Sequence, residues 1–211
     1  MIDFIIGITG GSGVGKTTLI DHLRSEFGSD VSVFSLDNYY LPKETQKLDE
    51  NGVVNFDLPT ALDVEAIEKD VNTLMKGKTV QLSRYNFNNP STEEEILTVH
   101  PSRLLIVEGL FVMHYAFLRE KLNLSVYLSV EEELQLQRRL KRDVEERNYT
   151  YEDVMYQWKN HVLPAYDNYV RPYKKEVDLI ITNNTAFDEN IDTLISVIRK
   201  KLNKQASNLP G

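Results

Sequence analysis

The chain has 211 residues, no cysteine and a formal net charge of -8 at pH 7. Its length fits one domain with its own core, and its negative charge argues against nucleic acid as a partner, because such proteins need excess Lys and Arg to neutralise phosphates. The lack of cysteine excludes disulfides, thiolate catalysis and cysteine-ligated zinc. Apolar runs fall far short of the roughly 20 residues of a membrane helix, and no basic signal-peptide region precedes the first one. We therefore expect one cytoplasmic domain over 1–211 that acts on a small molecule and has no membrane partner.

Short apolar runs rich in β-branched residues alternate with amphipathic helical patterns along the chain. The runs predict core strands at 4–9, 31–36, 103–107, 124–129 and 177–182. Helical spacing predicts helices over about 19–27, 64–74, 131–145, 151–170 and 188–202. This alternation is typical of an α/β fold with a five-stranded, mostly parallel sheet and helices on both faces.

Two segments interrupt the alternation. Residues 37–62 form a long polar connection after the second strand, and connections of that length in compact domains are usually functional or disordered. Residues 79–99 predict a small β-hairpin, with 80–84 paired to 96–99 and a polar loop between them. We interpret both segments as additions to the sheet that shape a substrate site.

The segment after the first strand fits the pattern G-x-x-x-x-G-K-[ST] as Gly10-Gly11-Ser12-Gly13-Val14-Gly15-Lys16-Thr17. Between a strand and a helix, this pattern predicts a phosphate-binding loop. Its backbone N–H groups would surround phosphate oxygens, Lys16 would reach the β and γ phosphates, and the Thr17 hydroxyl would bind Mg²⁺. Thr18 would add a hydroxyl near the α phosphate. The alternative is a glycine-rich turn with a solvated Lys16, which would leave inward N–H groups unpaired at a cost.

Two acids are predicted at the carboxyl ends of core strands, where open α/β sheets bind their ligands. Asp37 follows the second strand, and a carboxylate there could accept the proton of an attacking hydroxyl. Glu108 follows the third strand and suits a metal site, directly or through water. The alternatives are a turn or helix-capping role for Asp37 and simple solvation for Glu108.

Basic residues gather at the end of the fourth predicted helix, as Arg138, Arg139, Lys141, Arg142 and Arg147. Planar guanidinium groups can clamp a transferring phosphoryl group and neutralise its charge, so a helical lid over about 138–160 is one interpretation. The other is soluble surface, because glutamates flank the cluster and mixed-charge helix faces are common.

Together these motifs resemble the uridine kinase family, within the uridine kinase and phosphoribulokinase group of P-loop kinases. The resemblance spans Gly7 to about Asn183. Besides the phosphate-binding loop, its segments are Leu36-Asp37-Asn38-Tyr39-Tyr40, Asn55-Phe56-Asp57-Leu58-Pro59, Tyr85-Asn86-Phe87, Val107-Glu108-Gly109 and Arg138-Arg139-Leu140-Lys141-Arg142-Asp143-Val144-Glu145-Glu146-Arg147.

The resemblance implies a P-loop NTPase fold and ATP-dependent, Mg²⁺-dependent phosphorylation of the 5'-hydroxyl of uridine or cytidine. It implies a homo-oligomer, a tetramer or a dimer. It also implies site roles, namely Asp37 as catalytic base and magnesium neighbour, Asp57 on the ribose, Tyr85 and Phe87 around the base, Arg139 and Gln157 on the nucleoside, and Arg142 and Arg147 in the lid. Without the resemblance, Tyr85 and Phe87 would be hairpin residues packed on the core, and Asp57 a turn residue.

The chain departs from the family pattern in two places. Asn88-Asn89-Pro90 stands where the family usually has a pyrimidine-contacting histidine, and Asn148-Tyr149 stands where it usually has Gly-Arg. Both changes bear on acceptor choice, which depends on buried polar contacts. Two alternatives therefore stay open. One is a related kinase for another small alcohol, such as a sugar phosphate, a pantothenate-like acid or another nucleoside, and the other is a nucleotide-binding regulatory module without catalysis.

Overall fold

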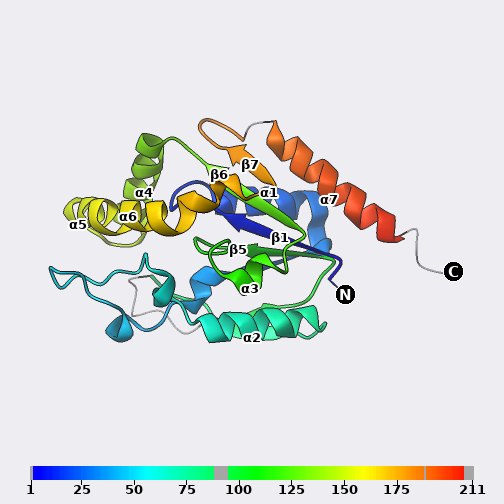
Figure 1. Cartoon of the computed structure of the whole chain (residues 1–211), viewed down its shortest axis with the longest axis horizontal. Coiled ribbons are helices and arrows are strands. Elements are labelled where there is room, and N and C mark those ends of the chain that lie inside the picture. The colour runs from blue at the N-terminus through cyan, green and yellow to red at the C-terminus, as the bar shows by residue number, and fades with distance from the viewer. Residues whose placement is uncertain (1, 88–94, 188, 207–211) are drawn as a thin grey trace.

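The computed structural model describes residues 2–87, 95–187 and 189–206 (Figure 1). Within them, five strands form one sheet in the order β2-β5-β1-β6-β7. Their bounds are Phe4–Thr9 (β1), Val31–Ser35 (β2), Leu104–Glu108 (β5), Leu124–Ser129 (β6) and Leu179–Thr182 (β7). Every neighbouring pair in this sheet is parallel. The predicted α/β fold with its five-stranded sheet is confirmed.

The centre of the sheet is apolar because helices cover both of its faces. All six residues of β1 are buried, which explains why the strand reads as a continuous apolar run. The strand order reverses around β1, since β5 and β2 lie on one side of it and β6 and β7 on the other. Ligands of open α/β sheets bind at such a reversal, beyond the carboxyl ends of the strands.

The helices separate into layers around this sheet (Figure 1). The helices Lys16–Phe27 (α1) and Asn190–Ala206 (α7) pack on one face. The helices Val64–Met75 (α2) and Ala116–Arg119 (α3) pack on the other. The carboxyl ends of the strands point toward α4 (Glu132–Glu146), α5 (Tyr151–Gln157) and α6 (Leu163–Ala165). Within the described ranges, no helix is long and apolar enough to span a bilayer.

The segment predicted as a helix over 151–170 is helical throughout but irregular. Two π-helical turns, Trp158–Val162 and Tyr166–Val170, flank α6. Pro164 lies in α6 and has no N–H to donate to the carbonyl four residues before it. Wider turns relieve such a lost bond, and they recur at functional sites. Sequence periodicity did not show them, and it also missed the short α3.

The two additions to the sheet are ordered wherever the structure describes them. The strands Val80–Ser83 (β3) and Ile96–Val99 (β4) form the predicted antiparallel hairpin, with Val80 opposite Val99. Asn88, Asn89 and Pro90 lie outside the described residues, as does Asp188 at the predicted start of the last helix. The connection 37–62 contains short 3-10 turns and is tied together by bridges between Tyr40 and Leu62 and between Leu48 and Val54.

Replacing Ile106 by alanine tests the packing of the sheet centre. Ile106 is 0% exposed, so Ile106→Ala should lower the free energy of unfolding by about 2–5 kcal/mol through lost burial and a residual cavity. Ile96 in the hairpin is 55% exposed, and Ile96→Ala should change it by less than about 0.5 kcal/mol. Denaturant unfolding measures both, and similar losses in the two variants would contradict this picture of the core.

Candidate functional site

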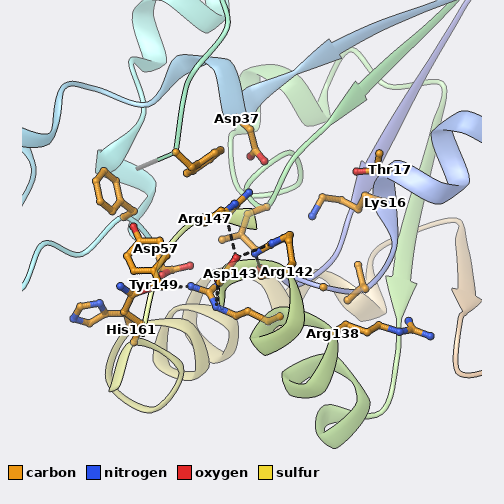
Figure 2. A pocket seen from close by; sticks show the side chains of 18 of the residues that line it. Lys16, Thr17, Asp37, Asp57, Arg138, Arg142, Asp143, Arg147, Tyr149 and His161 are labelled. Atoms are coloured by element: carbon orange, nitrogen blue, oxygen red, sulfur yellow. Dashed lines mark hydrogen bonds and ion pairs between the residues drawn. The ribbon is translucent and has the colours of Figure 1, made fainter. Parts of the chain in front are cut away.

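The loop between β1 and α1 faces a cleft of about 360 Å³, which residues 12–18 line (Figure 2). Helix α1 begins at Lys16 without a side-chain cap and without an acidic residue in its first turn. Its first N–H groups and the positive end of its dipole are therefore suited to an anion. Gly10 and Gly11 precede the lining residues, and their carbonyl oxygens lie 3.2 and 3.5 Å from the Lys16 ammonium, which donates to both.

Two amides from distant segments hold this loop from outside. Gln135 Nε2 donates to the Ser12 carbonyl at 2.7 Å, and Asn183 Nδ2 donates to the Val14 carbonyl at 2.9 Å. Gln135 and Asn183 do not line the cleft, so they hold these two carbonyls without filling the space that an anion at the loop's N–H groups would need. Gly15 has φ +96°, and a Cβ there would lie 2.3 Å from Asn183 Nδ2, so only glycine fits. The sequence motif predicted the loop but gave no sign of these two supports.

Asp37, Glu108 and Thr17 line the same cleft as the loop. Glu108 is the last residue of β5, and its register partner is Ser35 at the end of β2. The Ser35 hydroxyl donates to the Glu108 carboxylate and accepts from the Asp37 N–H. The pairing of β2 with β5 thus brings both predicted acids to one edge, as expected from their positions at strand ends.

Burial raises the pKa of Glu108 to about 7, and the neighbouring Asp37 charge adds to this shift while the Lys16 ammonium opposes it. A cation between these groups would relieve the repulsion. Among the residues that the structure describes, no group of three or more His, Cys, Asp or Glu side chains could hold a metal ion by itself. Two carboxylates and the Thr17 hydroxyl fit Mg²⁺, because this ion usually takes one or two protein carboxylates together with substrate phosphate oxygens.

A buried aspartate organises most of the arginine cluster. Asp143 is 1% exposed, and its carboxylate lies 3.2 Å from Arg139 Nε, 2.8 Å from Arg142 Nε and 3.4 Å from Arg147 Nη1 (Figure 2). Arg142 also donates from Nη2 to the Ser12 hydroxyl at 3.1 Å. The three cations therefore share one buried counter-charge, and Arg142 reaches the phosphate-binding loop.

The basic residues that gather in the sequence do not all contact Asp143 in the structure. Arg138 turns away from Asp143, and its guanidinium donates to the carbonyls of Asn183 and Asn184. Asp143 carried a sequence signal, since it stands one residue after Arg142 and four from both Arg139 and Arg147, yet we did not assign it a role. Arg139 is buried, and its Nε has no aligned hydrogen-bond acceptor.

Aromatic rings form the end of the cleft away from the loop. Tyr40, Phe56 and Phe87 line it. Tyr85 does not line the cleft, but its ring supports Phe87 at a centroid distance of 4.8 Å. The Arg147 guanidinium covers the Phe87 ring at 4.1 Å from its centroid, a cation–π contact that joins the hairpin side to the end of α4. Tyr40 and Phe56 lie inside segments that carried the family resemblance, but their part in the cleft was missed.

Polar groups complete this end of the cleft. Figure 2 shows Asp57, Tyr149 and His161 at the far side from Lys16. Burial raises the pKa of Asp57, although the Arg139 charge opposes the shift. Arg139 Nη2 donates to Gln157 Oε1 at 3.2 Å, so these two predicted nucleoside contacts also touch each other. Tyr149 is one of the departures from the family pattern, and His161 was not noticed in the sequence.

The sequence profile of the Phosphoribulokinase / Uridine kinase family matches residues 5–188. The chain belongs to this family. It is 33% identical over 196 residues to a uridine kinase of Macrococcus caseolyticus, across 92% of this chain and 95% of the relative. It is 31% identical over 205 residues to uridine-cytidine kinase B of Dictyostelium discoideum, across 97% of this chain and 84% of the relative.

The solved structure of phosphoribulokinase from Rhodobacter spheroides has the same fold, with a TM-score of 0.61 at 14% identity over 86% of this chain and 70% of that one. The chain is therefore a kinase, a phosphotransferase with an alcohol group as acceptor. Membership in a kinase family implies ATP as the phosphoryl donor.

The raised pKa of Glu108 makes the stability of the kinase depend on pH. The folded state holds the Glu108 proton up to about pH 7, whereas the unfolded state releases it near 4.5. The folded protein therefore loses stability as pH rises through this window, and Glu108→Gln should remove that loss. We expect the variant to gain about 1–3 kcal/mol over the wild type at pH 8 relative to pH 5.

Denaturant unfolding without Mg²⁺ or nucleotide measures this difference. The matched control is Glu145→Gln, which removes an exposed glutamate of α4. A difference between Glu108→Gln and the wild type that stays constant from pH 5 to pH 8 would show that Glu108 does not hold its proton.

Proposed function

We propose that this kinase transfers the γ-phosphoryl group of ATP to the 5'-hydroxyl of a pyrimidine nucleoside, uridine or cytidine, as an enzyme of pyrimidine salvage. The observation that carries the proposal is a single cleft with a phosphate-binding loop at one end, aromatic rings and Asp57 at the other, and Asp37 between them. The names of the relatives, uridine kinase and uridine-cytidine kinase, support the same acceptor.

In this proposal the donor phosphates lie along the loop from Gly10 to Thr18, and Lys16 contacts the β and γ phosphates. Thr17, Asp37 and Glu108 would hold Mg²⁺, which neutralises charge on the phosphate oxygens when bound. Arg142 and Arg147 stabilise the charge of the transferring group. The link from Arg142 to Ser12 supports this role, since it already holds a guanidinium at the loop.

Asp37 serves as the general base. A carboxylate that accepts the hydroxyl proton as the bond to phosphorus forms contributes roughly 10²–10⁴ in rate. Asp37 is suited to the task because it follows β2 in a tight turn and lines the cleft beside the residues that would hold the metal. Glu108 is half-buried beside it and would serve the metal instead.

The acceptor end is suited to a neutral hydroxylated ring compound. Half-buried Asp57 would accept hydrogen bonds from two ribose hydroxyls, and such bonds compensate for its partial loss of solvent. Phe87, supported by Tyr85, would contact the base, while Arg139 and Gln157 would bind its polar edge. A phosphorylated acceptor would bring further negative charge beside Asp37 and Asp57, which disfavours it. The single domain, the cytoplasmic location and the dimer or tetramer stay predictions.

Asp37→Asn should lower kcat by about 10²–10⁴ while the affinity for ATP stays within about twofold, because the base acts mainly in the transition state. Steady-state kinetics with saturating ATP and Mg²⁺, together with equilibrium binding of an unreactive ATP analogue, measures the two effects separately. An Asp37→Asn enzyme with normal turnover would refute the assignment.

A panel of acceptors tests the substrate class. Uridine and cytidine should support ATP consumption and yield the 5'-monophosphates, whereas purine nucleosides, ribulose 5-phosphate and pantothenate should not. Product analysis by chromatography identifies the phosphorylated position. Turnover of another alcohol in place of uridine and cytidine would assign a different substrate to the same fold. Binding of nucleotide with no acceptor phosphorylated would instead favour a regulatory module.

A further inference from the structure

Residues 47–55 turn back on themselves within the long connection after β2. Asp49 N donates to the Val53 carbonyl at 2.9 Å, and Asn55 N donates to the Lys47 carbonyl at 2.8 Å. This small turn immediately precedes Phe56 and Asp57 and contains Val54, all of which line the cleft. Its position therefore fixes one wall of the proposed acceptor end.

Asp49 connects this turn to the helical segment 151–162, whose Gln157 and His161 also line the cleft. Its Oδ1 accepts from the backbone N–H groups of Asn51 and Val53, both at 2.9 Å. Its Oδ2 accepts from the Tyr156 hydroxyl at 2.6 Å and lies 2.7 Å from His161 Nε2. Together these hydrogen bonds hold the pKa of Asp49 below its ordinary value, and the bond from Tyr156 has the largest effect. One carboxylate thus shapes its own turn with one oxygen and joins a separate helix with the other.

The π-helical turn makes this connection possible. In a regular α-helix, residues five apart point about 140° away from each other. The wider turn Trp158–Val162 brings Tyr156 and His161 to the same side instead, with ring centroids 5.7 Å apart. Both side chains can therefore reach one oxygen of Asp49, while Gln157 lines the cleft together with His161.

Of the three side chains that join the turn to the helical segment, only one lies at the surface of the cleft. Asp49 and Tyr156 do not line the cleft, whereas His161 does, and its ring is 1% exposed. Asn51 Nδ2 adds a further bond to the Tyr156 hydroxyl at 2.7 Å. The two walls that these bonds join carry Asp57 on one side and Gln157 on the other.

We propose that Asp49 and Tyr156 are positioning residues that hold the two walls of the acceptor site at a fixed separation. This inference rests on the proposed function, because it assigns acceptor binding to that end of the cleft. With the walls joined before binding, the acceptor does not have to order residues 47–57 itself. The phosphate-binding loop and Asp37 take no part in the connection, so donor binding and chemistry are independent of it.

Asp49→Asn tests the connection with little change of shape. An asparagine keeps the Oδ1 acceptor for Asn51 and Val53, but its NH₂ group removes the charged acceptor that the Asp49 carboxylate offers to the Tyr156 hydroxyl and to His161 Nε2. We expect the acceptor KM to rise about tenfold, since hydrogen bonds to a charged partner are lost. The KM for ATP and kcat should stay within about twofold. Tyr156→Phe should also raise the acceptor KM, but by less than Asp49→Asn does, because the bond between Asp49 and His161 remains.

The matched control is Glu50→Gln, which removes the neighbouring exposed charge and should leave all three constants unchanged. Uridine is the acceptor for these measurements. Unchanged uridine KM in folded Asp49→Asn, or an equal loss for uridine and ATP, would overturn the positioning role.

Hydrogen exchange of the protein without substrates separates this inference from the proposed function. Amides of residues 47–57 should exchange at least about tenfold faster in Asp49→Asn than in the wild type or Glu50→Gln, because the turn opens more often. If the wild type fails to phosphorylate uridine and cytidine while this difference is present, the proposed acceptor is wrong and the connection stands. If the amides of residues 47–57 exchange at the same rate in all three proteins, the hydrogen bonds of Asp49 do not hold the two walls together, and this conclusion does not depend on the acceptor.

Discussion

The parallel pairing of β2, β5 and β1 brings three strand ends to one edge of the sheet, and the chemistry of the cleft depends on this constraint. The turn after β1 becomes the phosphate-binding loop, the turn after β2 carries Asp37, and β5 ends in Glu108. The phosphate-binding loop, Asp37 and Glu108 can act together on a bound phosphate only when they lie next to one another. Asp37 and Glu108 repel one another, and burial of Glu108 intensifies the repulsion. The sheet holds them together against it, which prepares the site for a cation.

The positive charge on the other side of the cleft is held in place by a buried carboxylate. Arg139, Arg142 and Arg147 share the carboxylate of Asp143, which is almost fully buried. A buried ion pair gains little net stability by itself, but it keeps several guanidinium groups in a small volume without their mutual repulsion dispersing them. Because Arg142 also contacts Ser12 and Arg147 covers Phe87, this cluster links the phosphate-binding loop to the aromatic rings that line the cleft.

The acceptor end is built from segments that are distant in the sequence and irregular in structure. The turn 47–55 has little regular secondary structure, and the helix opposite widens into π-helical turns beside Pro164. Irregular segments carry less intrinsic order than the sheet, so the hydrogen bonds between them decide their geometry. In this protein the sheet topology places the phosphate-binding loop, and side-chain bonds from Gln135 and Asn183 support it, whereas the segments that form the end of the cleft around Asp57 are joined by side-chain bonds.

The sequence by itself determined the fold class, the phosphate-binding loop and the strand-end acids, because apolar periodicity and the spacing of Gly15, Lys16 and Thr17 are local properties of the chain. It did not show that Gln135 and Asn183 support the loop, that Arg138 leaves the arginine cluster, or that His161 lines the cleft. The irregular helix was equally hidden, because helical spacing predicted only a helix over 151–170 and not its wide turns. Only the tertiary structure decided the supports of the loop and the places of Arg138 and His161, because each depends on contacts between segments that the chain separates by tens of residues or more.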